Sequence, residues 1–115
     1  MKKIKVADII SNAFSSEQAL RLKEEMERYM NDEEKIILDF SGIDKYTTLF
    51  FNFSTGYFIG KIGKEKYDRL VELDNLSNLG QSTYQNSYFN ATRDDFENAT
   101  IENEIINILK NPDEV

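Results

Sequence analysis

The sequence contains no cysteine, no histidine and no tryptophan, and it has a single proline. Without cysteine there is no thiol nucleophile, and without histidine the chain lacks the side chain whose pKa lies nearest neutrality. Cysteine and histidine are also the usual ligands of zinc. These absences exclude the active-site arrangements of most hydrolases. We therefore expect a protein that is not an enzyme and holds no cofactor or metal.

Long apolar runs are also missing. A membrane-spanning helix needs about 18 or more apolar residues in a row. The most apolar stretch, Leu49 to Ile62, is interrupted by Asn52, Ser54 and Lys61. The N-terminus begins with a basic residue pair, but Asp8 breaks the apolar stretch that a secretion signal would need. We therefore expect a cytoplasmic protein.

Positive charge is scarce. The chain has 14 lysines and arginines against 21 aspartates and glutamates, which gives a formal net charge of -7. The basic residues are scattered among acidic ones rather than gathered into a stripe. Such a surface repels phosphate backbones and anionic lipids. The composition therefore favours a protein partner over nucleic acid or a membrane.

The first half of the chain predicts a strand, a helix and a second strand. Apolar residues from Ile4 onward indicate a short first strand. Ser15 to Gln18 has the pattern of a capping box, so a helix should begin there and end near Asn31. The run from Lys35 to Phe40 is short, apolar and bounded by charge, which is typical of a central strand buried on both faces. Four apolar residues line one side of the predicted helix: Ala19, Leu22, Met26 and Met30.

The second half of the chain is richer in helical patterns. The aromatic segment from Leu49 to Ile62 predicts one helix, and Tyr67 to Leu73 predicts a third strand. Leu76 to Thr92 suits an irregular helix or a loop, and Asp94 to Lys110 predicts a terminal helix. We therefore expect residues 1–115 to form one layered α/β domain. Its central mixed or parallel sheet should have three or four strands, with helices packed on it and a C-terminal helix.

A family resemblance covers roughly residues 4–76. It rests on the runs Ile36–Ile43 (IILDFSGI) and Tyr46–Phe50 (YTTLF). These runs resemble the core of the STAS-like domain family of unknown function. That family is related to the STAS domains of sulphate transporters and anti-sigma factor antagonists. The resemblance implies a regulatory module that binds another protein.

The resemblance also implies a switch. In the antagonists, a Ser or Thr at the start of the helix after the central strand is phosphorylated by a partner kinase, which switches binding off. Thr48 occupies that place, beside Thr47, although the Asp-Ser-Ser-Gly-like pattern of the antagonists is absent. The implied partner is a histidine-kinase-like ATPase. A phosphate at a helix N-terminus also meets free amides and the positive end of the helix dipole. Alternatively, either threonine simply caps the helix.

The aromatic residues after Thr48 are the candidate partner-binding surface. They cannot all face one small sheet, so those left outside would form an apolar patch beside the threonines. Alternatively, all of them belong to the core. The candidates for partner binding are Phe50, Phe51, Phe53 and Tyr57, with Phe58 completing the cluster.

Three other functions stay open. The chain is alternatively a small-molecule or nucleotide sensor, because STAS relatives sometimes bind nucleotides. It is alternatively an enzyme that uses Thr48, Lys45 or Asp44, or a structural subunit whose aromatic helix is buried in a homodimer. Asp39 and Asp44 flank a turn, but two carboxylates without regular loop spacing are more typical of solvated acids than of a cation site.

Overall fold

The structure is a computed structural model that describes the backbone of residues 1–104 and the side chains of residues 1–92. Three strands form a sheet in the order β1-β2-β3, and both pairs are parallel. The strands are β1 (Lys2–Lys5), β2 (Ile36–Asp39) and β3 (Val71–Asp74). The predicted α/β class and the central position of the second strand are both confirmed.

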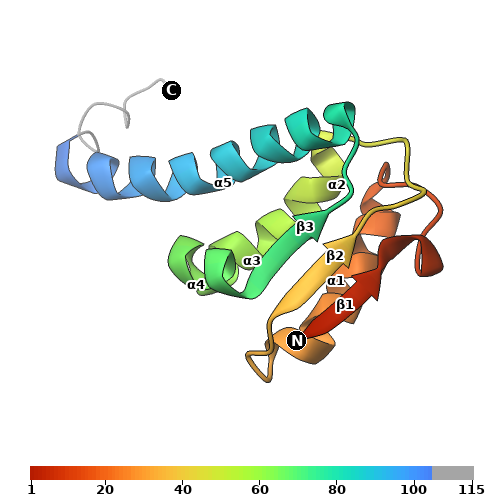
Figure 1. The fold of residues 1–115 in the computed structure, drawn as a ribbon. Coiled ribbons are helices and arrows are strands. Elements are labelled where there is room, and N and C mark those ends of the chain that lie inside the picture. The colour runs from red at the N-terminus through yellow and green to blue at the C-terminus, as the bar shows by residue number, and fades with distance from the viewer. Residues whose placement is uncertain (105–115) are drawn as a thin grey trace.

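Helices make up most of the rest of the described chain, and loops connect the elements. In Figure 1, α1, α2 and α3 lie behind the strands, while α5 crosses one end of the sheet and extends beyond it. The helical elements are the 3-10 turn η1 (Val6–Asp8), α1 (Ser16–Met30), α2 (Thr48–Phe53), α3 (Thr55–Ile62), α4 (Lys64–Leu70) and α5 (Asn78–Glu104).

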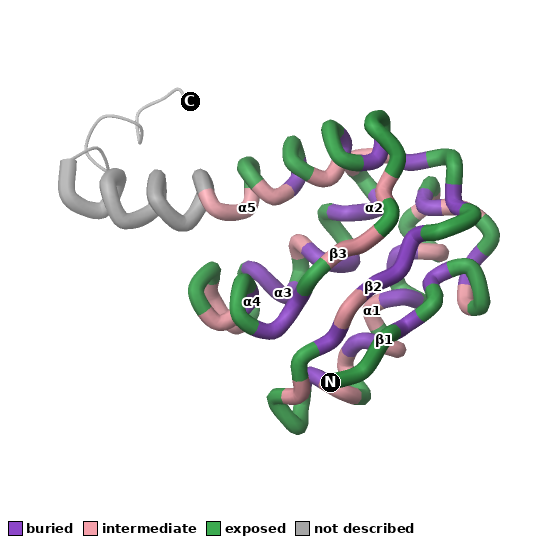
Figure 2. The backbone as a smooth tube through the Cα atoms, viewed as in Figure 1, coloured by how far each residue is buried: buried purple, intermediate pink, exposed green. Residues whose placement is uncertain are grey.

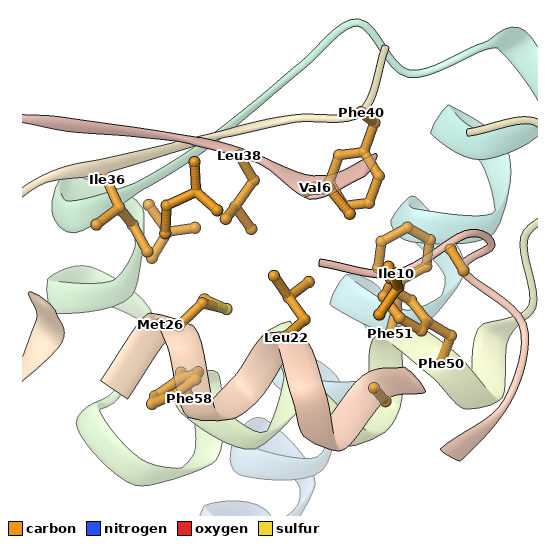
Figure 3. Close-up of a cluster of buried hydrophobic side chains, with 14 of the residues drawn as sticks. Val6, Ile10, Leu22, Met26, Ile36, Leu38, Phe40, Phe50, Phe51 and Phe58 are labelled. Atoms are coloured by element: carbon orange, nitrogen blue, oxygen red, sulfur yellow. The ribbon is translucent and has the colours of Figure 1, made fainter. Parts of the chain in front are cut away.

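The core lies between the sheet and these helices. Ile4 and Leu38 are neighbours in the register and are both buried on this side. Figure 3 shows Leu38 facing Leu22 of α1, and Phe40 facing Phe51 of α2, within the same apolar cluster. On the other side of the sheet Ile37 is half-buried, as the pink segment of β2 shows (Figure 2). The expected burial of β2 on both faces is therefore wrong at Ile37.

Helix α1 begins where the sequence predicts it. The Ser15 hydroxyl accepts a hydrogen bond from the Gln18 amide at 3.2 Å, and the Gln18 side chain accepts one from the Ser15 amide at 3.1 Å. This reciprocal capping box satisfies two backbone donors that a helix start leaves unpaired. All four apolar residues of the predicted stripe are buried.

The aromatic segment is two helices, so the prediction of one helix over 49–62 is wrong. The chain breaks at Ser54, whose φ and ψ are -114° and -86°. There the buried Ser54 hydroxyl donates to the Phe50 carbonyl at 2.8 Å, and the Thr55 hydroxyl donates to the Phe51 carbonyl at 3.3 Å. Such hydroxyls compete with the amides of the next turn for these carbonyls. The break turns α3 to a new direction along the sheet.

The third strand is shorter than predicted, because Tyr67 to Leu70 belongs to α4. Gly63 has φ of +89° and so permits a second helix to start immediately after α3. Lys64 and Asp68, one turn apart, form an ion pair at 2.9 Å. Tyr67 and Leu70 are buried three residues apart, a spacing that also fits a helix.

The last two predicted segments form one helix, α5, over Asn78–Glu104. The Ser77 hydroxyl accepts from the Gly80 amide at 3.0 Å and so starts the helix. No proline and no further glycine interrupts residues 81–104. Residues 105–110 of the predicted terminal helix lie outside the described residues, as do the side chains expected to form its apolar side.

Candidate functional site

Thr47 holds the start of α2. Its hydroxyl accepts a hydrogen bond from the Phe50 amide at 3.1 Å and donates one to the Phe14 carbonyl at 2.6 Å. Its amide donates to the Ala13 carbonyl at 2.9 Å, beside a parallel bridge between Ala13 and Tyr46. Thr47 therefore caps α2 and ties it to the segment before α1.

Thr48 is the first residue of α2 and is half-buried. Among the residues whose side chains the structure describes, its hydroxyl has no hydrogen-bond partner, whereas both bonding functions of the Thr47 hydroxyl are in use. Of the two switch candidates, Thr48 is thus the one whose hydroxyl can be modified without breaking an existing bond.

The four aromatic candidates separate into two groups. Phe50 and Phe51 are fully buried, and Phe51 stacks on Tyr46 with ring centres 6.2 Å apart. Phe53 and Tyr57 are 48% and 38% exposed. Phe50 and Phe51 hold α2 on the sheet, so only Phe53 and Tyr57 lie where a partner would reach them without opening the core.

Phe53 belongs to an apolar strip along α2. Leu49, one helical turn earlier, is also exposed, and side chains four residues apart share a helix face. On either side of this strip, Phe50 enters the core and Asn52 faces α5, where it accepts a hydrogen bond from Ser87 at 2.6 Å. Leu49 and Phe53 therefore project outward beside α1.

Leu20 of α1 extends the strip. Lys23 on α1 places its Nζ atom 4.2 Å from the centre of the Tyr57 ring, and the Phe14 carbonyl binds Thr47 at the other end. These two contacts fix α1 alongside α2 and α3. Leu20 is exposed and lies on the turn before Lys23. We call the exposed set Leu20, Leu49, Phe53 and Tyr57 the Phe53 face.

The sequence interpretation did not single out Leu20 or Leu49. A signal for Leu20 exists, since it stands outside the apolar stripe of α1, where a solvent-facing helix position would normally be polar. Nothing in the sequence marked Leu49 as exposed, because residues 49–62 were assumed to form one helix whose apolar faces continue through Ser54.

Two lysines meet at the Tyr57 end of the Phe53 face. Lys61 on α3 lies 5.7 Å from the centre of the ring that Lys23 covers at 4.2 Å. Glu27 approaches Lys61 at 3.9 Å, whereas Lys23 forms no ion pair with any carboxylate of residues 1–92. Of the two ammonium groups at this ring, only that of Lys61 therefore has a carboxylate at ion-pair distance within the described residues.

Asp39 closes the carboxyl end of the sheet. Its carboxylate accepts hydrogen bonds from the Asn75 side chain at 2.9 Å and from the Ser41 amide and hydroxyl at 3.0 and 2.7 Å. The Asn75 and Ser41 donors lower the pKa of Asp39 from 3.8 to about 2. Asp39 thus joins the loops after β2 and β3, while Asp44 is exposed. Among the described residues, no group of three or more acidic side chains is placed to hold a metal ion.

A cavity of about 740 Å³ opens between the loop after β1 and the first turns of α1. Its lining carries two basic side chains, Arg21 and Lys45, and two acidic ones, Asp8 and Glu17, so their formal charges balance. Thr48 and Asp44 are not among the lining residues, so the three side chains considered for catalysis do not gather there.

Comparison with known families gives one match. Residues 18–81 match the family described as STAS-like domain of unknown function (DUF4325). The matched segment includes the whole Phe53 face, Thr47 and Thr48. No curated protein and no solved structure matches the chain. No helix within residues 1–104 is long and apolar enough to cross a membrane.

Proposed function

The chain belongs to the family of STAS-like domains of unknown function, and on that premise we propose that it is a non-enzymatic regulatory module that docks on another protein through the Phe53 face. STAS domains are often regulatory interaction modules. The observation that carries the proposal is the exposure of Phe53 and Leu49 on a helix whose neighbouring Phe50 and Phe51 are fully buried. Adjacent exposed apolar side chains are typical of surfaces that another protein covers.

Phosphorylation of Thr48 is the proposed switch. Thr48 lies one residue from Leu49, at the same end of α2. A phosphate there adds between one and two negative charges and a shell of bound water beside the apolar strip. Docking of an apolar partner surface then requires removal of that water, which opposes binding. The vacant hydroxyl of Thr48 and the occupied hydroxyl of Thr47 support Thr48 as the modified residue.

The proposed partner is a histidine-kinase-like ATPase that also transfers the phosphate. Support for this part comes from the family resemblance, in which such an ATPase both binds and phosphorylates the antagonist.

The test compares four tagged proteins as bait in lysate from the organism that encodes the chain, with ATP present. They are the natural chain, Phe53→Glu, Thr48→Glu and Leu79→Glu, which changes an exposed leucine on α5 away from the face. We expect one stoichiometric partner with the natural chain and with Leu79→Glu, and at least tenfold less with the other two. A fraction of the recovered bait should carry phosphate on Thr48. Equal recovery with Phe53→Glu would refute docking at this face, and absence of phosphate on Thr48 would refute the switch alone.

A second candidate function rests on the cavity beside α1. Its lining of two basic and two acidic side chains offers both hydrogen-bond donors and acceptors to a polar small molecule such as a nucleotide. The test is thermal unfolding with added nucleotides. A rise in melting temperature that disappears in Arg21→Ala supports a sensor, and no shift at millimolar nucleotide contradicts it.

A further inference from the structure

We propose that the Phe53 face receives an amphipathic α-helix of the partner that places a carboxylate against Lys23. The inference rests on the proposed function, since it names the chemistry of the partner at the same face. It is carried by two observations, the exposed apolar side chains on α1, α2 and α3 and the ammonium group of Lys23, which forms no ion pair within the described residues.

The shape of the apolar strip matches a helix. Leu49 and Phe53 lie one turn apart on the same face of α2, and the neighbouring α1 carries Leu20 and, one turn later, Lys23, which contacts the Tyr57 ring of α3. A helix that lies along such a strip presents apolar residues at positions i, i+3 or i+4, and i+7. An extended peptide needs an accessible sheet edge instead, and the β1 edge carries Lys2, Lys3 and Lys5, which oppose pairing with another strand.

The charges near Tyr57 indicate which kind of residue the partner helix carries beside its apolar anchors. Lys23 and Lys61 approach the same ring, but only Lys61 forms an ion pair with Glu27. Lys23 is half-buried as a residue, and its Nζ atom lies against the Tyr57 ring. Covering it with an apolar or basic surface leaves an unpaired charge at the interface, whereas an aspartate or glutamate supplies a charge-assisted hydrogen bond.

These positions give the partner helix a spacing. Its apolar anchors contact Leu20, Leu49 and Phe53, and its acidic residue lies about one turn from them, above Tyr57. A second copy of this chain is a less suitable occupant, because two chains of net charge -7 repel each other.

The experiment selects 16-residue peptides from a displayed random library, using the full chain as bait and Phe53→Glu for counter-selection. We expect enriched peptides to carry two apolar residues three or four positions apart, with Asp or Glu three or four positions from one of them. They should lack internal proline and become helical on binding. Replacing the acidic residue by lysine should weaken binding to the natural chain at least tenfold, and Lys23→Glu should reverse that preference. Arg28→Glu, on exposed α1 surface, serves as the matched charge control.

Each other outcome overturns the inference in a distinguishable way. Enriched peptides with a basic residue at that position, or with proline-containing extended sequences, refute the partner chemistry while docking at the face stands. Absence of peptides that depend on Phe53 refutes a helical occupant, and the bait experiment above then decides whether docking itself fails. Sedimentation that shows a dimer of the natural chain but a monomer of Phe53→Glu identifies a second copy as the occupant.

Discussion

The Nζ atom of Lys23 on α1 lies 4.2 Å from the centre of the Tyr57 ring on α3. This contact and the bond from Thr47 to the Phe14 carbonyl hold α1 along α2 and α3 at two separate points. Between these points the side chains of Leu20, Leu49 and Phe53 are left exposed. The packing of three helices, rather than any one of them, therefore produces the Phe53 face.

The two threonines should differ sharply in their effect on stability. Thr47→Val removes the cap on the Phe50 amide and the bond to Phe14, so the free energy of unfolding should fall by about 1–2 kcal/mol. Thr48→Val removes no hydrogen bond within the described residues, so the change should stay within about 0.5 kcal/mol. Urea denaturation followed by circular dichroism measures both. Equal losses would contradict the assignment of Thr47 as the structural residue.

Asp39 should make the stability of the fold depend on pH in the acidic range. Its folded pKa of about 2 lies below the ordinary value of 3.8, because the charged form accepts hydrogen bonds from Asn75 and Ser41. The ionised carboxylate therefore stabilises the fold above pH 3.8, and this contribution is lost as the pH falls towards 2. Asp39→Asn should be less stable than the natural chain at pH 7.

The same difference should shrink between pH 4 and pH 2, where the natural chain also becomes protonated at this position. Denaturant midpoints measured across this range test the prediction, with Asp44→Asn, an exposed loop position, as the control. A difference between Asp39→Asn and the natural chain that stays constant from pH 7 to pH 2 would contradict it.

Gly80 should be intolerant of any side chain. A Cβ atom at this position would lie 2.8 Å from the Cζ atom of Tyr46. Tyr46 is buried and donates its hydroxyl hydrogen bond to the Ile43 carbonyl at 2.7 Å, so it cannot move aside without losing that bond. Gly80→Ala should therefore lower the free energy of unfolding by about 1–3 kcal/mol.

Gly60 provides the matched control. It lies inside α3, and a Cβ atom there would meet nothing within 4 Å. Because alanine favours the helix over glycine, Gly60→Ala should raise the free energy of unfolding by up to about 1 kcal/mol. Thermal or urea unfolding of both variants tests the pair. Tolerance of Gly80→Ala would contradict the packing of α5 against Tyr46, and destabilisation by Gly60→Ala would contradict the open space around Gly60.

Local patterns in the sequence predicted the first half of the fold. The capping box at Ser15 depends only on residues three apart, and the apolar run of β2 is bounded by charge, so neither needed knowledge of the tertiary structure. The break at Ser54 was missed because a serine bonds back to a carbonyl in many unbroken helices. The start of β3 was missed because Tyr67 and Leu70 fit a helix and a loosely alternating strand equally well.

The candidate site was predicted only in part, for the same reason. Treating residues 49–62 as one helix placed Phe50, Phe53 and Tyr57 on a single arc. In the structure Phe50 is buried and Phe53, on the same helix α2, is exposed, while Tyr57 lies on α3 after the turn at Ser54. Which aromatic side chains reach the surface depends on that turn and on the packing of α1 and α5 against α2, and neither is visible in residue spacing.

The most direct test of docking is photo-crosslinking in living cells of the organism that encodes the protein. The photoreactive residue p-benzoylphenylalanine replaces Phe53 in one protein and Leu79, an exposed residue of α5 outside the Phe53 face, in another. Our account predicts that irradiation links position 53 to one defined partner protein, and that Lys23→Glu in the same chain greatly reduces this product. The same product from both positions, or no product from position 53, would contradict it.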